Sequence, residues 1–317
     1  MSLSIIIPTF NRLWSLTEAI ASCPRDPRIE IIVIDDGSND GTAEWLSEQS
    51  GITVITQTNT GKSRAVNGAM ASARGDYIRF LDSDDILITG QVIPQLEFAQ
   101  ASNADVCVAG YREWFSQGDR YIEHPWDDCG DFLAQQLGEC DSSHYSAYIF
   151  RRSFIAGLEH RTEYAIMDDR AFVVDCAMEQ PRVSTWPEPT LIHRQHNNAR
   201  IQFQPGSMHT IADWQELQMW KRIINQLDAK ALNTPRRLVA VTNNLWPLAV
   251  RIGARFPGEG REVFHLIQQL VPEFVPPCDS AAGKVFRLVG IKATMHIARC
   301  ARLLRNFVRR LAFFSRR

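Results

Sequence analysis

Residues 77–85 read YIRFLDSDD, an apolar run that leads directly into three aspartates and one serine. An apolar run of this length, rich in β-favouring residues, predicts a buried strand. Because unpaired carboxylates are costly to bury, the aspartates belong at the exit of that strand, where a cleft or a cation can solvate them. Residues 31–38, IIVIDDGS, form a second exit of this kind. Two such exits indicate a hard, oxygen-ligated cation with a polyol or nucleotide between them.

The first 110 or so of the 317 residues alternate between the strand period and the helix period. We expect strands at 4–8, 30–34, 52–56, 77–81 and 105–109, and helices at 13–22, 41–49, 62–74 and 90–100. Alternation at this spacing predicts a parallel sheet with right-handed crossovers. Ligands of such sheets bind beyond the carboxyl ends of the strands. The polar segments 8–12, 35–38 and 82–85 all fall at that edge.

The remainder of the chain has a different character. Residues 110–200 are rich in aromatic and polar residues, which fits either a substrate-facing surface or a half-buried core. From about residue 207 the pattern is helical, with expected helices at 207–228, 235–254 and 259–270. Residues 284–317 contain ten Lys or Arg and no acidic residue, whereas residues 1–283 hold 24 basic and 36 acidic residues. A basic tail on an acidic body indicates an anionic partner for the tail.

The overall composition narrows the class of protein. Hydrophobic residues make up 45% of the chain and charged residues 22%, as in ordinary soluble proteins. The net charge of −2 and the lack of a recognisable binding module lead us to expect no nucleic-acid partner. Seven cysteines without a C-x-x-C pair argue against a disulfide scaffold or structural zinc site, and indicate a reducing compartment. We expect no secretory signal, and no stretch reaches the roughly 18 apolar residues of a membrane span.

The acidic and glycine-containing loops each have two interpretations. Asp82 and Asp84 point the same way in an extended segment, where Mg²⁺ or Mn²⁺ takes one or two carboxylates together with phosphate oxygens. The alternative is a solvated turn that caps the next helix. Residues 35–42 either form such a turn or supply carboxylates to a base or ribose. Residues 59–68, NTGKSRAVNG, open a helix whose amides favour an anion such as pyrophosphate, without the spacing of a P-loop or dinucleotide motif.

Four segments taken together resemble the family 2 glycosyltransferases with the GT-A fold. They are SIIIPTFNR at 4–12, VIDDGS at 33–38, the helix start at 59–68 and FLDSDD at 80–85. The resemblance implies an α/β protein with a Rossmann-like, mostly parallel sheet and flanking helices, followed by a C-terminal helical region. It implies four parts: a nucleotide-sugar-binding half at 1–110, an acceptor-binding half at 111–205, a helical extension at 206–277 and a basic amphipathic tail at 278–317.

The resemblance also implies roles for individual residues. The nucleotide-sugar pocket would consist of Pro8, Thr9, Asn11, Arg12, Asp36, Gly61, Arg64, Asn67, Asp82 and Ser83. Asp36 would pair with a uracil-type base, Asp82 would lie at the ribose, and Arg64 would lie near the base or the phosphates. Asp84 would be the metal ligand of the D-x-D motif and would bind Mn²⁺ or Mg²⁺.

Two later segments extend the resemblance. Inverting members of the family use a carboxylate base in a Glu-Asp pair before an apolar helix, and residues 167–172, MDDRAF, match that pattern. Asp169 stands at the position of the base and Asp168 where Glu is usual, so either can be the base, or the pair can simply cap a helix. Residues 191–198 resemble the segment after the last strand that brings a histidine to the diphosphate or metal. His196 is therefore a second expected metal ligand, with a structural histidine as the alternative.

The basic tail shows a helical pattern with an apolar face and an arginine-rich face. The apolar face consists of Ile297, Cys300, Ala301, Leu304, Phe307, Val308 and Leu311. A basic amphipathic helix of this kind predicts binding to an anionic membrane surface through residues 284–317. The alternative is a helix that packs on the protein and leaves its basic face solvated.

Taken together, we expect an inverting, metal-assisted glycosyltransferase of the hexosyltransferase type. It would move a sugar from a nucleoside-diphosphate sugar, UDP-linked in the first instance, to a hydroxyl of a cell-surface glycan, polysaccharide, lipopolysaccharide or lipid-linked saccharide. The expected location is the cytoplasm, peripheral on the inner face of the plasma membrane. One alternative is a sugar-phosphate nucleotidyltransferase. Such an enzyme would require a glycine-rich loop after the first strand, but residues 8–12 contain no glycine. The other is a non-catalytic nucleotide-binding scaffold on a membrane.

Overall fold

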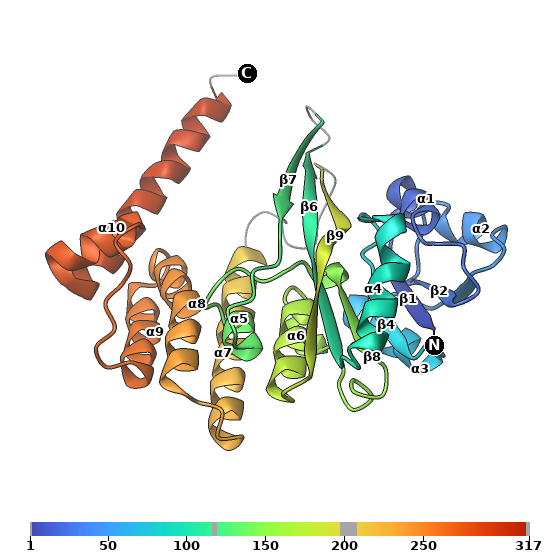
Figure 1. The fold of residues 1–317 in the computed structure, drawn as a ribbon. Coiled ribbons are helices and arrows are strands. Elements are labelled where there is room, and N and C mark those ends of the chain that lie inside the picture. Colours follow the sequence, from blue (N-terminus) through green and yellow to red (C-terminus); the bar gives the residue numbers. More distant parts are fainter. Residues whose placement is uncertain (1, 116–118, 197–207, 315–317) are drawn as a thin grey trace. The chain divides into compact units, whose positions relative to one another are not determined.

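The computed structural model describes residues 2–115, 119–196 and 208–314, except for the side chains of 208–209 and 306–314. The chain divides into two compact units. The first comprises residues 1–136 and 141–200, and the second comprises residues 137–140 and 201–317. An α/β sheet forms the first unit, and helices form most of the second (Figure 1).

The N-terminal half of the first unit is a parallel sheet, which confirms the predicted alternation. Its strands lie in the order β3-β2-β1-β4, and all neighbours in this part pair in parallel. The elements are β1 (Leu3–Thr9), α1 (Leu13–Ala21), β2 (Ile29–Asp35), α2 (Thr42–Ser47), β3 (Thr53–Thr56), α3 (Lys62–Ser72) and β4 (Tyr77–Phe80). All seven correspond to ranges expected from the sequence.

Beyond β4 the sheet is mixed. The elements are β5 (Ile86–Leu87), α4 (Thr89–Ala101), β6 (Val106–Phe115), β7 (Arg120–His124), α5 (Phe132–Gln136), η1 (Tyr145–Ala147), β8 (Tyr148–Arg151), η2 (Thr162–Tyr164), α6 (Asp168–Met178) and β9 (Val183–Gln195). β8 pairs antiparallel with β4 and with β6, so the strand expected at 105–109 does not extend the parallel run directly. Figure 1 shows β6, β7 and β9 side by side, β7 antiparallel and β9 parallel to β6.

Apolar side chains cover both faces of the sheet. Along β1, Ile5 joins a core that includes Leu16 of α1 and Leu96 of α4. Ile6, the next residue, joins the opposite core together with Phe172 of α6. Successive side chains of a strand point to opposite faces, so a strand that is covered on both sides is apolar throughout. This burial fixes the ends of the strands and therefore the loops at the carboxyl edge.

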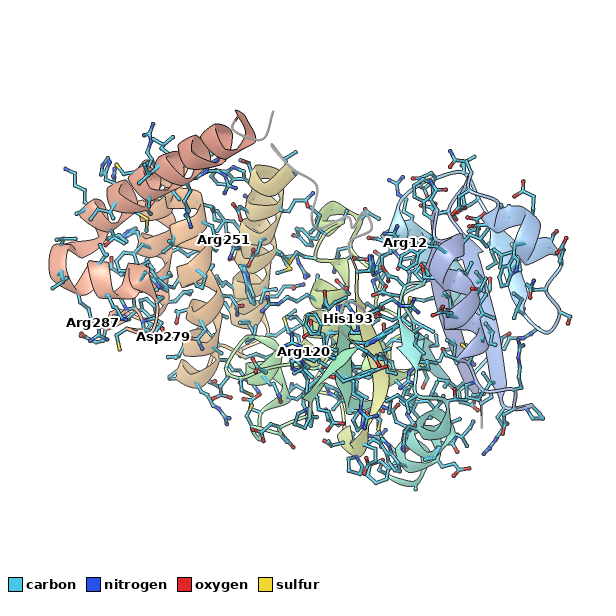
Figure 2. The ribbon with its side chains drawn as sticks, turned by 90° about the horizontal axis from the view of Figure 1, so that it is seen from above. Arg12, Arg120, His193, Arg251, Asp279 and Arg287 are labelled. Carbon is cyan, nitrogen blue, oxygen red and sulfur yellow. The ribbon has the colours of Figure 1, made fainter. Side chains whose placement is uncertain are left out.

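The second unit contains α7 (Met208–Ala229), α8 (Pro235–Gly253), α9 (Pro257–Leu270) and α10 (Ala281–Phe314). The first three confirm the helices predicted from residue 207 onward. Arg251 of α8, labelled in Figure 2, donates to Asp213 of α7 over 2.9 Å and joins these two helices. None of the described helices is both long enough and apolar enough to cross a membrane.

One face of α10 packs on the rest of the helical unit. The ring of Phe286 lies 5.2 Å from that of Phe264 and 5.9 Å from that of Trp246, and Met295 is fully buried. The helix is kinked at Gly290, whose φ of 72° is a conformation that favours glycine. The packing-helix alternative therefore holds for part of the tail.

Candidate active site

The loops that follow β1 and β2 are bonded to each other at the carboxyl edge of the sheet. The amide of Asp36 donates to the carbonyl of Thr9 over 2.9 Å, and the amide of Asn11 donates to the hydroxyl of Ser38 over 2.8 Å. Asn11 has a φ of 52°, a left-handed conformation that asparagine tolerates. Pro8 and Thr9 are buried at the end of β1. The predicted residues of these two loops therefore lie together, as expected.

The buried carboxylate of Asp36 holds the loop that precedes α3. Its Oδ1 accepts bonds from the Gln57 side chain over 2.7 Å and from the amide of Thr60 over 2.8 Å. Its Oδ2 accepts from the amide of Gly61 over 2.8 Å. The structure thus gives Asp36 a positioning role at the rim of the predicted nucleotide pocket. Its contact with a base stays a prediction.

The two metal ligands expected from the sequence face each other. Nε2 of His196, directly after β9, lies 3.0 Å from Oδ2 of Asp84, and Nε of Arg12 lies 3.8 Å from the same oxygen. The imidazole of His196 is also 4.8 Å from the ring of Trp14 in an edge-on contact. The side chain of Asp84 is 22% exposed, so a ligand at this edge can reach it. Residues 191–195 belong to β9 itself, and 197–198 lie outside the described residues.

A second group with metal-binding chemistry lies next to the first. Asp85, His144 and His193 each offer one ligand atom, and these atoms lie within 4.8 Å of one another. Asp85 is 1% exposed, and its Oδ1 lies 3.0 Å from Nδ1 of His193 and accepts a hydrogen bond from the amide of Arg194 over 3.0 Å. Burial lowers the pKa of His144, although nearby Asp85 opposes this. A neutral imidazole is the form that binds a metal. Asp85 was expected at the exit of the strand at 77–81 and His193 lies in the segment 191–198, but none of these three residues was predicted from the sequence to be a metal ligand.

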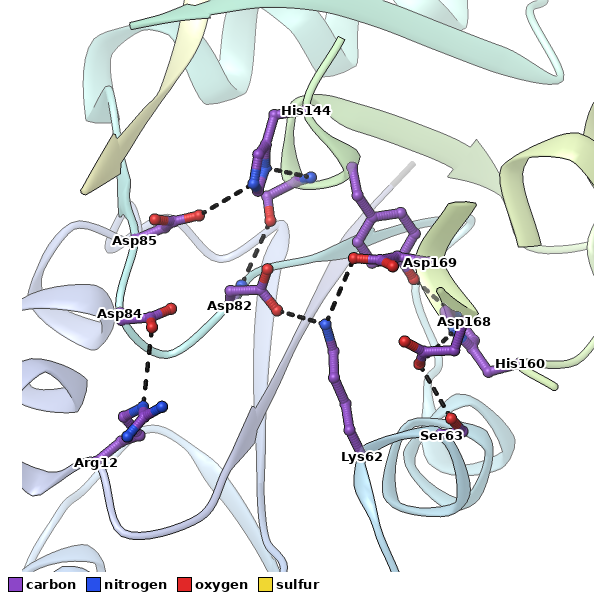
Figure 3. Close-up of polar contacts among 12 residues, drawn as sticks. Arg12, Lys62, Ser63, Asp82, Asp84, Asp85, His144, His160, Asp168 and Asp169 are labelled. Carbon is purple, nitrogen blue, oxygen red and sulfur yellow. Dashed lines mark hydrogen bonds and ion pairs between the residues drawn. The ribbon is translucent and has the colours of Figure 1, made fainter. Parts of the chain in front are cut away.

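Lys62 lies between Asp82, at the exit of β4, and Asp169, at the start of α6, as Figure 3 shows. Its Nζ is 2.8 Å from Oδ1 of Asp82 and 3.8 Å from Oδ2 of Asp169. Burial alone would raise the pKa of Asp82, but the charge of Lys62 lowers it to about 2. Burial raises the pKa of Asp169, and repulsion from Asp168 and Asp82 adds to this effect while Lys62 opposes it. The three carboxylates and one ammonium therefore form one electrostatic unit.

Asp168 and Asp169 begin α6 but have different environments. Asp168 is 2% exposed, and its Oδ2 accepts from the hydroxyl of Ser63 over 3.1 Å. The same oxygen lies 3.4 Å from Nδ1 of His160, whose Nε2 is 2.7 Å from the hydroxyl of Tyr145. The side chain of Asp169 is 25% exposed. Asp168 is thus held by its neighbours, whereas Asp169 faces the site (Figure 3).

The remaining predicted residues differ in how close they lie to this cluster. Asn67 of α3 exchanges two hydrogen bonds with the backbone of His160, at 2.8 and 2.7 Å, and therefore joins α3 to the segment before α6. Ser83 is buried between the two aspartates of the D-x-D motif. Arg64 is exposed on α3, and among the contacts described for this chain none joins it to the acidic residues.

Lys62 belongs to the segment 59–68, where the sequence predicted binding of an anion such as pyrophosphate, and in the structure its ammonium group contacts carboxylates of the protein itself. The sequence did contain a signal for this contact. Lys62 follows Gly61 at the start of a predicted helix, and that helix start lies at the same edge of the sheet as the acidic loops. His144 and His160 come from the irregular segment between β7 and α6, where no periodicity marks their position. Local sequence therefore did not place them.

Comparison with known proteins gives the family context. Residues 4–155 match the model of glycosyl transferase family 2. The chain is 28% identical over 222 residues to "Uncharacterized glycosyltransferase EpsJ" of Bacillus subtilis, covering 64% of each protein. It is 31% identical over 132 residues to "Putative teichuronic acid biosynthesis glycosyltransferase TuaG" of the same organism, covering 38% of this chain and 52% of TuaG. The chain therefore spans less than two thirds of the length of these curated relatives.

Among solved structures, the crystal structure of S. aureus TarS 1-349 superposes with a TM-score of 0.64. The match covers 96% of this chain and 92% of TarS 1-349 at 15% identity, which shows a common fold. The mixed sheet with flanking helices and a C-terminal helical region is a GT-A-like architecture. Residues 4–155 therefore resemble the family 2 glycosyltransferases, and the fold resembles that of TarS 1-349.

Proposed function

We propose that this protein transfers a sugar from a nucleoside-diphosphate sugar to an acceptor hydroxyl with inversion of the anomeric centre. The observation that carries the proposal is the distance of Lys62 from both Asp82 and Asp169. Through these two contacts, the exit of β4, which is predicted to hold the donor, and the start of α6, which is predicted to hold the base, belong to one cluster. Titratable groups that perturb one another in this way are typical of active sites.

The carboxylate assigned as base is Asp169. It takes the proton of the acceptor hydroxyl, whose oxygen bonds to the anomeric carbon as the bond to the diphosphate oxygen breaks. A single displacement of this kind inverts the anomeric centre. Asp168 is the weaker candidate because its buried carboxylate accepts a hydrogen bond from Ser63 and lies against the imidazole of His160. A base must reach its proton, and the 25% exposure of the Asp169 side chain satisfies that requirement.

The residues at the strand exit fit a divalent cation. Asp84 and His196 offer one oxygen and one nitrogen 3.0 Å apart, and Nδ1 of His196 has no hydrogen-bond partner within the described part of the chain. A carboxylate and an imidazole are ligands that suit Mn²⁺, and Mg²⁺ accepts the carboxylate. A cation held there would neutralise charge on the leaving diphosphate. Asp85, His144 and His193 are a second candidate set.

The donor class is supported by structural neighbours. S. aureus TarS 1-349 is known in complex with UDP-GlcNAc, with a TM-score of 0.56 to this chain. The mannosyltransferase PcManGT from Pyrobaculum calidifontis is known with GDP-Man and Mn²⁺, with a TM-score of 0.52. We propose a UDP-sugar donor and Mn²⁺ or Mg²⁺ for this protein. The acceptor is proposed to be a surface polysaccharide or lipid-linked saccharide, a class supported by the name of TuaG.

We further propose that the protein works in the cytoplasm on the inner face of the plasma membrane, through α10. Five large apolar residues of this helix have exposed fractions between 47% and 84%: Leu288, Val289, Ile297, Leu303 and Leu304. Lys284, Arg287, Lys292, Arg299 and Arg305 are exposed on the same helix. Exposed apolar residues mixed with cations fit an anionic bilayer, where each Lys or Arg contributes about 1 kcal/mol. The side chains of Phe307, Val308 and Leu311 lie outside the description.

Donor turnover with a panel of UDP-, GDP- and dTDP-sugars tests the activity. The purified chain with Mn²⁺ should release the nucleoside diphosphate from one class of donor, and should transfer the sugar to a lipid-linked or polysaccharide acceptor. Formation of a nucleotide sugar from a sugar phosphate and a nucleoside triphosphate would instead show a nucleotidyltransferase. Binding without turnover of any donor would favour the scaffold alternative.

A further inference from the structure

Lys62 has more carboxylates around it than one cation can neutralise. It is the first residue of α3, and its side chain is 21% exposed. Its ammonium group contacts Asp82 at 2.8 Å and Asp169 at 3.8 Å, and it lies 5.9 Å from the ring centroid of Tyr145. Asp168 is adjacent to Asp169 in α6 and lies on the same side of the cluster (Figure 3).

The position of Lys62 is set by bonds to the backbone directly before it. Asp36 accepts hydrogen bonds from the amides of Thr60 and Gly61, each over 2.8 Å. Gly61 has a φ of 94°, a left-handed conformation in which glycine is favoured. This turn starts α3 and places the side chain of Lys62 over the exit of β4. The cation is therefore held by the fold and does not depend on a flexible surface contact.

We propose that Lys62 is a positioning residue that keeps the Asp169 carboxylate ionised and oriented for proton abstraction. The inference rests on the proposed function, in which Asp169 is the base. A carboxylate with two like charges nearby favours its protonated form, and a protonated base takes no proton. One cation between Asp82 and Asp169 offsets that repulsion. The same cation links the donor side of the site to the acceptor side.

The charged and titratable groups around Asp169 come from four elements. Lys62 of α3 stabilises its charge, and Asp82 after β4 and Asp168 of α6 oppose it. His144, before η1, would stabilise it when protonated, but burial lowers the pKa of this imidazole. The hydroxyl of Tyr145 stays protonated because burial raises its pKa well above the usual range. Lys62 is therefore the permanent positive charge of this group at neutral pH.

The titration of Asp169 tests the inference without any need for turnover. The full chain is labelled with ¹³C at the aspartate carboxyl carbons, and the Asp169 signal is assigned by its loss in Asp169→Asn. An opposite charge within about 4–6 Å lowers a carboxyl pKa by about 1–3, so Lys62→Met should raise the Asp169 midpoint by about that amount. Lys62→Arg keeps the charge and should stay near wild type. Lys221→Met, an exposed lysine of α7, is the matched control and should leave the midpoint unchanged.

The pH dependence of transfer gives the second readout. In Lys62→Met the acidic limb of kcat/KM should move to higher pH, and the rate should approach wild type above the raised midpoint. A merely structural loss would lower the rate at every pH. An unchanged Asp169 midpoint in Lys62→Met, or in Lys62→Gln if the first variant unfolds, overturns the inference. A shifted midpoint in a protein that transfers no sugar would leave the electrostatic effect of Lys62 on Asp169 intact and reject the proposed function.

Discussion

Nε2 of His196 lies 3.0 Å from Oδ2 of Asp84, although 112 residues separate the two in sequence. The fold brings them together because β4 ends in the D-x-D loop and β9 ends just before His196. An imidazole nitrogen and a carboxylate oxygen that face each other in this way can share a divalent cation. A diphosphate at the same edge would complete the shell of such an ion.

The first prediction concerns this pair. Asp84→Asn and His196→Ala should each weaken Mn²⁺ binding at least about tenfold by calorimetry and abolish metal-dependent transfer, because the first removes the negative charge of a ligand and the second removes a ligand atom. Asp84→Asn should change the free energy of unfolding by no more than about 0.5 kcal/mol, since a partly exposed side chain contributes little packing. Full activity in excess EDTA would contradict metal assistance altogether.

Asp85→Asn is the matched comparison for that prediction. Asp85 is buried and accepts bonds from His193 and from the amide of Arg194. Its loss should lower the free energy of unfolding by about 1–3 kcal/mol while Mn²⁺ binding persists. If Asp85→Asn loses the ion and Asp84→Asn retains it, the cation belongs to the group of Asp85, His144 and His193.

The second prediction separates the two candidate bases. Asp169→Asn should lower kcat by about 10²- to 10⁴-fold and leave the dissociation constant of the donor nearly unchanged, because the base acts on the proton of the acceptor. Asp168→Asn should keep a larger share of kcat but lose stability, since the hydroxyl of Ser63 donates to its buried carboxylate and Nδ1 of His160 lies 3.4 Å from it. A folded, inactive Asp168→Asn beside an active Asp169→Asn would exchange the roles.

Sequence patterns were enough for the parallel half of the sheet and for the helices after residue 207. They were not enough for β9, whose strand includes Pro187 and Pro189 and whose pairing with β6 shifts register between Ala109 and Tyr111. Nor did they show that β8 inserts between β4 and β6. Such pairings depend on contacts between distant residues, and a local period carries no information about them.

The residues of the candidate site divide in the same way, into those that the local sequence indicates and those that only the fold brings together. The carboxylates at the ends of β2 and β4 could be selected because a buried strand cannot hold them unpaired. The contact of Lys62 with Asp169 joins α3 to α6 across 107 positions and left no trace in either segment. In the sequence, a lysine beside a glycine at a helix start is equally typical of a residue that binds a phosphate and of one that pairs with carboxylates of the protein. Only the fold shows that carboxylates surround it.

A third prediction follows from the raised pKa of Asp169. A carboxyl group whose pKa is higher in the folded protein than in the unfolded chain favours folding in its protonated form and opposes folding when ionised. Asp169→Asn should therefore be more stable than wild type at pH 7. The difference should shrink as the pH falls below the unfolded value near 4, where wild-type Asp169 is protonated in both states. Urea unfolding at pH 7 and at pH 3.5 measures it, and equal stability at pH 7 would contradict it.

The fourth prediction separates the two roles of Asp36. Asp36→Asn places an amide donor where one carboxylate oxygen accepts from Thr60 or Gly61, so one backbone amide loses its partner. The free energy of unfolding should fall by about 1–3 kcal/mol. If Asp36 also contacts the base, the dissociation constant of UDP should rise further than that of inorganic diphosphate. An equal rise for both ligands would leave Asp36 with its positioning role alone.

The last prediction concerns α10, whose first part cannot simply be removed. Phe286 and Met295 pack inside the helical unit, so truncation after residue 283 would expose its core as well as delete the cations. A sharper variant changes the exposed face only, by serine substitution at Leu288, Ile297, Leu303 and Leu304. Its control carries serine at four exposed apolar positions outside α10: Val54, Ile211, Val239 and Val275.

The first variant should sediment with anionic liposomes at least about tenfold more weakly than wild type, because each exposed large apolar residue loses about 1.5–3 kcal/mol of burial in the bilayer. The control should bind as wild type does. Binding of the wild type should also weaken in 1 M salt, where the Debye length falls from about 10 Å at 0.1 M to about 3 Å. Donor hydrolysis should be equal in all three proteins. Equal sedimentation of both variants with anionic and neutral liposomes would reject the membrane role and leave α10 as a helix that packs on protein alone.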